Sequence, residues 1–162
     1  MADPIAAAGL AASVLQLADV GARLSIKLFT VGKQIKNASR TYETISQEVS
    51  LTTSVLHQLG KNLRDDSQDA IHNEASLKIV SALTKECDTV FTDLRAAVTT
   101  EIKPGATSAA KRWSKWSHCL ALPYREKDME ASRSKLENVK SLLNIILTSL
   151  TLASQVKGSK SR

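Results

Sequence analysis

The sequence has little of several residue types, and each shortage excludes a class of protein. Aromatic residues make up 4% of the 162 residues, and there are only 3 prolines, 3 histidines and 2 cysteines. Cys87 and Cys119 lack a paired spacing, and His57, His72 and His118 stand on separate segments. The sequence therefore carries neither a disulfide framework nor a metal-ligand pattern. We expect a cytoplasmic protein that uses no metal and no cofactor.

Motifs of common enzymes are also missing from the sequence. It has no Gly-rich phosphate loop, no nucleophile elbow and no HExxH motif. The adjacent acids Asp65 and Asp66 stand in a segment of turn-forming residues, which explains them without a catalytic role. We therefore expect that the chain is not an enzyme.

The residues that are abundant favour helices. Hydrophobic residues make up 43% of the chain, and because aromatics are scarce the core must consist of Leu, Ile, Val and Ala. No segment alternates with period two for long enough to predict a strand. The prediction is an all-α fold, an elongated bundle of four long helices plus one short Trp-containing helix. It forms a single domain over 1–156, with helices at 4–36, 40–64, 67–103, 107–121 and 126–156 and a basic tail or linker at 157–162.

The first predicted helix is unusual because residues 4–18 carry no charge. One stripe with three-four spacing should pack in the bundle; it comprises Leu10, Val14, Leu17, Gly21, Leu24, Leu28, Val31 and Ile35. Further apolar residues fall outside that stripe, so this half of the helix is either enclosed by protein or destined for lipid. The uncharged run is shorter than the ~20 residues that span a bilayer. The candidate membrane and self-association residues are Ile5, Ala8, Gly9, Leu10, Ala12, Val14, Leu15, Leu17 and Gly21. A structural alternative is that a crowded bundle has room only for small side chains here.

The last predicted helix resembles the first one in its composition. Its packing seam comprises Leu136, Val139, Leu143, Ile146, Leu150 and Ala153. Extra apolar residues, Leu142, Ile145, Leu147 and Leu152, lie outside this seam. We therefore expect the first and last helices to pack on each other in the middle of the bundle.

A basic segment with both tryptophans follows Pro104. The net charge of the chain is +6, which favours anionic partners. The candidate anionic-surface residues are Lys111, Arg112, Trp113, Lys115 and Trp116. Because tryptophans and lysines suit the membrane interface, anionic lipids are the expected partner. The alternative is that the tryptophans pack on the bundle. Nucleic acid is disfavoured, since the aromatic and basic side chains fall on opposite faces.

Several stretches carry a resemblance to a known family. They are MADPIAAAGLAASVLQLADVGARL, EVSLTTSVLHQLGKNL, KRWSKW and SKLENVKSLLNIILTSL. The chain resembles, over most of its length, the fungal N-terminal domain that precedes STAND (NLR-like) nucleotide-binding and ankyrin-repeat proteins. The family is named after the N-terminal domain of azaphilone pigment cluster protein L, and it is similar to the HeLo and HeLo-like helical bundles of fungal heterokaryon incompatibility proteins.

The resemblance implies a signalling or cell-death module. Such a domain would form homo-oligomers, precede nucleotide-binding or repeat domains, and reach membranes through its first helix. Asp19 opposes simple insertion, because a carboxylate at mid-bilayer costs at least ~2.5 kcal/mol. The alternative is a non-lytic interaction module that dimerises or holds a partner helix. A regulatory protein associated with nucleic acid is the third hypothesis.

Overall fold

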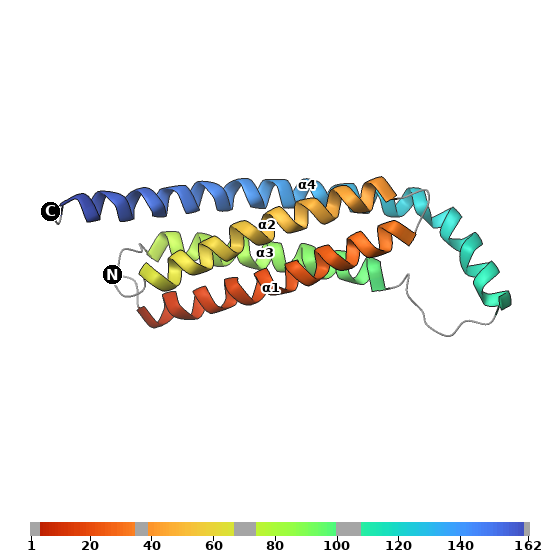
Figure 1. The fold of residues 1–162 in the computed structure, drawn as a ribbon, viewed down its shortest axis with the longest axis horizontal. Coiled ribbons are helices and arrows are strands. Elements are labelled where there is room, and N and C mark those ends of the chain that lie inside the picture. Colours follow the sequence, from red (N-terminus) through yellow and green to blue (C-terminus); the bar gives the residue numbers. More distant parts are fainter. Residues whose placement is uncertain (1–3, 35–38, 67–73, 100–107, 161–162) are drawn as a thin grey trace.

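The fold consists of helices, as the sequence predicts. A computed structural model describes the backbone of residues 4–34, 39–66, 74–99 and 108–160, and the side chains of 5–34, 40–65, 74–98 and 127–156. The helices are α1 (Pro4–Gln34), α2 (Ser39–Asp66), α3 (Glu74–Thr99) and α4 (Ser108–Lys160), and these described ranges contain no strand (Figure 1). The all-α bundle is therefore confirmed.

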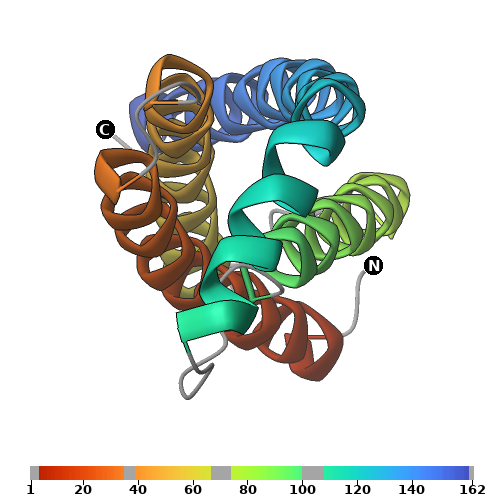
Figure 2. The same ribbon diagram turned by 90° about the vertical axis from the view of Figure 1, so that its right-hand side faces the viewer.

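The four helices alternate in direction along the bundle, but sequence neighbours are not always spatial neighbours. Helix α1 packs on α2 and α3, and α4 packs on the same two helices. Seen along the bundle, α1 and α4 lie diagonally opposite each other (Figure 2). The expectation that the first and last helices pack on each other was wrong. The two helices are instead separated by α2 and α3, on which both of them pack.

Most residues of the predicted packing seams form the core of the bundle. Of the others, Leu10 and Ile146 are half-buried, Ala153 is exposed, and Ile35 lies outside the described residues. In α1, Val14, Leu17, Leu24, Leu28 and Val31 are buried. Buried apolar residues also recur at helical spacing along α2 and α3, and the largest fully buried side chain is Phe91 of α3. Each fully buried Leu or Ile contributes roughly 1.5–3 kcal/mol. Apolar burial therefore holds the bundle together.

Two glycines allow α1 to approach its neighbours closely. A Cβ atom on Gly21 would lie 2.3 Å from Thr53 Oγ1 and 2.7 Å from Cε2 of Phe91. A Cβ on Gly60 of α2 would lie 2.7 Å from Cγ of Leu15. Real Cβ atoms do not approach other atoms so closely, because the atoms would overlap. Glycine at these positions therefore sets the distance between α1 and its neighbours.

Polar contacts fix how the helices are placed against each other. The hydroxyl of Ser46 on α2 donates to the carbonyl of Ser25 on α1 at 2.8 Å, inside the bundle. Lys140 of α4 donates to Glu48 of α2 at 2.5 Å, and both side chains are mostly buried. Partly shielded pairs of this kind are better at fixing geometry than at adding stability. They connect α2 to both of its neighbours.

One helix boundary differs from the sequence prediction. The short Trp-containing helix expected at 107–121 and the helix expected at 126–156 form one continuous helix, α4. Its first part, drawn in cyan, leaves the bundle at an angle (Figure 1). Pro123 lies inside α4, where a proline removes a backbone hydrogen bond and bends a helix without always ending it. A separate fifth helix is therefore not confirmed.

Candidate interaction surfaces

The candidate residues of α1 do not form one surface, because the bundle divides them. Val14, Leu17 and Gly21 are buried, and Leu10 and Leu15 are half-buried. Ile5, Ala8, Gly9 and Ala12 are exposed, with Ile5 at 80%. The first half of α1 is thus not enclosed on all sides. It presents an uncharged outward face to solvent.

The outward face continues along the whole of α1. Exposed positions recur at a three-four spacing that keeps them on one side of the helix; they are Ile5, Ala8, Ala12, Gln16, Asp19, Arg23, Ile26, Thr30 and Lys33. Before Asp19 this face holds small or apolar groups and one amide, and after Asp19 it holds Ile26, Thr30 and two basic groups. The charge on the outward face therefore changes at the middle of the helix.

Helix α4 presents an apolar surface that sequence reasoning assigned to packing. Leu142, Ile145, Leu152 and Val156 are between 47% and 63% exposed. Together with Ser149 they follow a strict three-four spacing, and we call these five residues the α4 stripe. Only Leu143 and Leu150 are buried in this uncharged segment, 141–156. The absence of charge in 141–156 was the signal that could have identified the stripe.

The hydroxyl groups of this α4 segment are bonded within the helix. Ser141, Thr148, Ser149 and Thr151 each donate to the carbonyl four residues earlier, at 2.8 Å. A hydroxyl that bonds its own helix does not need water as a partner. Covering this surface with apolar groups therefore leaves these four donors satisfied.

The five residues of the Trp-basic segment lie in the first part of α4. The backbone of Lys111, Arg112, Trp113, Lys115 and Trp116 is helical. Their side chains lie outside the described residues. The expectation that they form an anionic-surface site stays a prediction.

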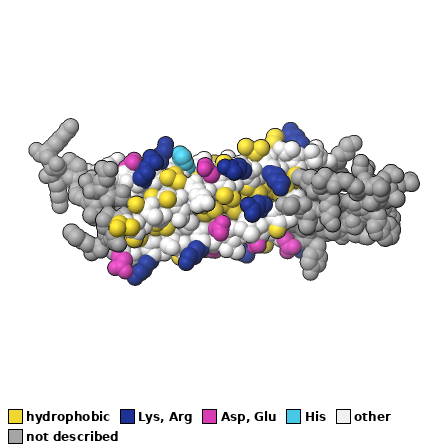
Figure 3. All heavy atoms as spheres, turned by 90° about the horizontal axis from the view of Figure 1, so that it is seen from below, with side chains coloured by type: hydrophobic (Ala, Val, Ile, Leu, Met, Phe, Trp, Pro, Cys, Tyr) yellow, Lys and Arg dark blue, Asp and Glu magenta, His cyan; other side chains and the backbone are white. Residues whose placement is uncertain are grey.

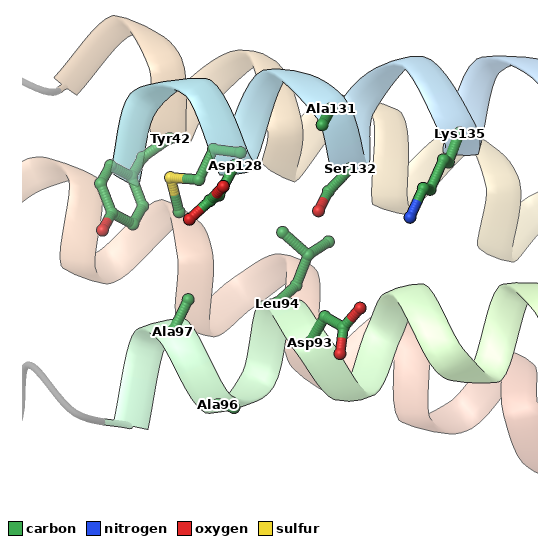
Figure 4. Close-up of a pocket in the computed structure, with 10 residues that line it drawn as sticks. Tyr42, Asp93, Leu94, Ala96, Ala97, Asp128, Ala131, Ser132 and Lys135 are labelled. Atoms are coloured by element: carbon green, nitrogen blue, oxygen red, sulfur yellow. The ribbon is translucent and has the colours of Figure 1, made fainter. Parts of the chain in front are cut away.

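A hollow of about 360 Å³ lies between α3 and α4, next to Tyr42 of α2. Lys135 and Ser132 of α4 point toward α3, and Asp93 of α3 points toward α4 (Figure 4). Lys135 and Asp93 carry opposite charges, which favours the packing of α3 and α4 on each other. Within the described part of the chain, no group of three or more His, Cys, Asp or Glu side chains is placed to hold a metal ion.

The described cysteine, Cys87, belongs to the core. Burial, together with the nearby charges of Asp88 and Glu86, raises the pKa of its thiol to about 12. The reactive form of a cysteine is the thiolate. Cys87 is therefore a packing residue and an unsuitable nucleophile.

Two helices are long and apolar enough to cross a membrane, judged by length and composition alone. They are Ile5–Gln34 and Lys127–Val156, and 33% and 17% of their most apolar windows are buried. Core helices of soluble proteins pass the same test, so this finding is weak evidence that either helix crosses a membrane.

Fold and surfaces together define an all-α helical-bundle domain with uncovered apolar helix faces. The sequence profile of one family, described as pigment biosynthesis cluster protein PigL N-terminal, matches residues 2–161. The chain belongs to this family. No curated protein and no solved structure matches the chain.

Proposed function

We propose that the chain is an N-terminal signalling domain of a fungal NLR-like protein, of the cell-death type, which self-associates and acts at membranes through α1. The observation that carries this proposal is the uncharged outward face in the first half of α1, where Ile5, Ala8, Gly9 and Ala12 are exposed. Membership of the PigL N-terminal family supports the placement as an N-terminal helical domain. Small side chains at four-residue spacing also favour close helix approach in lipid.

The packing of α1 limits how it can act. Release of α1 would expose Val14, Leu17, Leu24, Leu28 and Val31, which are all buried. At roughly 1.5–3 kcal/mol for each side chain, this costs about 8–15 kcal/mol, as much as the stability of a typical domain, roughly 5–15 kcal/mol. Membrane contact by the outward face of the folded bundle therefore comes first. Release follows only where lipid or further copies cover the same side chains.

A dye-release experiment with the full chain tests this proposal. Ala12→Glu places a carboxylate on the outward face of α1, and Ala82→Glu places one at an exposed position of α3. Both positions are exposed, so both variants should fold, as helical circular dichroism would check. We expect Ala12→Glu to abolish leakage from anionic vesicles, because a charge in lipid costs several kcal/mol. Ala82→Glu should leak like the parent protein.

Two results would contradict the membrane proposal. One is the absence of leakage for the parent protein at concentrations where it self-associates. The other is equal loss of leakage in both variants, because net charge would then explain the effect better than the face of α1.

A second candidate function, a non-lytic interaction module, is favoured by the α4 stripe. Its four apolar residues are about half exposed, and a heptad-spaced stripe of this kind suits helix pairing. We estimate that covering it on two copies contributes about 6–12 kcal/mol, against an association cost of roughly 4–15 kcal/mol. Any dimer formed by the stripe alone is therefore weak.

Sedimentation velocity separates the two candidates. Ile145→Ser combined with Leu152→Ser removes the centre of the α4 stripe, and Leu51→Ser combined with Ile79→Ser removes exposed apolar groups of α2 and α3. An interaction module that uses the stripe should lose self-association only in the first pair. Unchanged self-association in both pairs would exclude the stripe as its interface.

A further inference from the structure

We propose that the second half of α1 is a docking surface for anionic lipid headgroups. The surface, which we call the basic face, comprises Arg23, Ile26, Lys27, Phe29 and Lys33. This inference rests on the proposed membrane function, and it names the lipid class and the part of the folded bundle that meets it.

The first observation is a one-sided charge distribution. Residues 20–42 contain Arg23, Lys27, Lys33, Lys36 and Arg40 and no acid. Arg23, Lys33 and Arg40 are exposed and Lys27 is half-buried, whereas Lys36 lies outside the described residues. Each basic residue near an anionic bilayer adds about 1 kcal/mol of attraction. The charge of the basic face is therefore sufficient to orient the domain on such a surface.

The second observation is a pair of large apolar side chains among these charges. Ile26 is 67% exposed and Phe29 is 43% exposed. The ammonium group of Lys33 lies 5.0 Å from the centre of the Phe29 ring, a cation–π geometry. Apolar side chains next to basic ones are typical of helices that lie in the membrane interface.

Several acids lie on α1 and its neighbours; exposed Glu43 of α2 stands three residues before Ser46, which bonds Ser25 of α1. Asp19 is one turn before Arg23, and Asp88 of α3 lines a groove with Val20. Glu48 is paired with Lys140, on the side of α2 that faces α4. Figure 3 views the molecule from the side on which α1 lies, and it shows basic side chains gathered around hydrophobic ones on the right half of the described surface. Acidic side chains border this group.

A bilayer fits these observations better than other anionic partners do. Nucleic acid phosphates would pair with Arg23 and Lys33, but they would leave Ile26 in water. A lipid surface offers anionic headgroups and hydrocarbon together. Because Arg23 and Ile26 lie on the same outward side of α1 as Ile5 and Ala12, docking also brings the uncharged first half against the lipid.

Vesicle co-sedimentation of the full chain tests the basic face. Vesicles of phosphatidylcholine, with and without phosphatidylserine, are mixed with the parent protein and with two charge-matched variants. Arg23→Gln with Lys33→Gln neutralises the basic face, and Lys61→Gln with Lys78→Gln neutralises exposed positions of α2 and α3. We expect binding to require phosphatidylserine and to weaken tenfold or more in the first variant. The second variant should stay within about threefold of the parent.

Two single substitutions sharpen the test. Asp19→Asn removes the acid from the outward face and should strengthen binding several-fold. Ile26→Ser should weaken binding several-fold, whereas Ile79→Ser, at an exposed isoleucine of α3, should not. Equal losses of vesicle binding in the two charge-matched variants would overturn the proposal that the basic face docks on anionic lipid. Binding to DNA without binding to the vesicles would overturn it as well.

Dye release in the same samples keeps the two proposals apart. Binding that depends on the basic face, without leakage, supports the docking surface and contradicts membrane action by the first half of α1. Leakage that persists in Arg23→Gln with Lys33→Gln at unchanged affinity contradicts the docking surface and leaves the proposed function intact.

Discussion

The first half of α1 and the second half of α4 are similar in sequence and different in the bundle. Both are uncharged and rich in apolar residues, and each belongs to a helix that is long and apolar enough to be a candidate membrane span. In α1 the large apolar side chains mostly face inward, and Ile5 is the one large apolar residue that its first half exposes. In α4 the large side chains on the outer side stay in water, and only 17% of its apolar window is buried, against 33% in α1.

The difference shows that an apolar segment does not by itself indicate the core. Helix α1 packs closely on α2 because Gly21 and Gly60 allow it, and its outward positions are mostly small or polar. Helix α4 contacts α2 and α3 along one stripe, and a second stripe of large side chains remains uncovered. The α4 stripe is therefore a surface that is free for contact with another molecule, whereas α1 combines packing with a surface role.

The largest expected effect is a loss of stability that differs between the buried and the exposed side of α4. Leu143 is fully buried and its neighbour Leu142 is 47% exposed. We expect Leu143→Ala to lower the free energy of unfolding by about 2–5 kcal/mol, because it leaves a cavity. Leu142→Ala should lower it by less than about 1 kcal/mol. Urea unfolding followed by circular dichroism measures both, and equal losses would show that Leu142 is also covered.

A smaller effect compares two glycines of α1. Gly21→Ala should destabilise the bundle by about 1–3 kcal/mol, because its Cβ would meet Thr53 and Phe91. Gly9→Ala should stabilise it by roughly 0.4–1 kcal/mol, since a Cβ there meets nothing within 4 Å and alanine favours the helix. Thermal unfolding of both variants provides the measurement. Changes of the same sign would contradict the close approach at Gly21.

The smallest expected effect concerns the reactivity of Cys87 in α3, on which both α1 and α4 pack. The pKa of Cys87 is raised to about 12 by burial, so the native state holds its proton more tightly than the unfolded chain. Stability contributed by this thiol is fully present below its unfolded pKa and is lost as the pH rises toward 12. At pH 8 we expect Cys87 to react with iodoacetamide only through unfolding. Fast modification of the Cys87 peptide in mass spectrometry would show that α3 opens locally.

Much of the fold was predictable from local patterns. The seam of α1 repeats at helical spacing, and its large residues from Val14 to Val31 are buried as expected. The predicted ends of the first two helices lie within two residues of those observed. The third helix was predicted at 67–103 and α3 spans Glu74–Thr99; the predicted parts before and after α3 lie outside the described residues. One helix was expected to end at 121 and the next to begin at 126, but Pro123, between these positions, lies inside α4.

The candidate surfaces were predictable only in part. The sequence provided nine candidate membrane and self-association residues in α1. Their periodicity does not say which side of a nearly uniform apolar helix faces inward. The extra apolar residues of the last helix led to the expectation that the first and last helices pack on each other, but Leu142, Ile145 and Leu152 are exposed. The basic run from Arg23 to Arg40 was visible in the sequence, yet its significance depends on the exposure of Ile26 and Phe29 beside it.

The sequence by itself determined the helical class, the core seams and the absence of charge in two segments, because these follow from composition and from periodicity within one helix. Only the tertiary structure decided that α1 and α4 lie diagonally apart, that Val14 is inside while Ala12 is outside, and that the α4 stripe is uncovered. These outcomes depend on which helix packs beside which. The neighbours of each helix are determined by side-chain volume and by close approach between segments distant in the chain. Gly21, which lies close to Thr53 and Phe91, is an example.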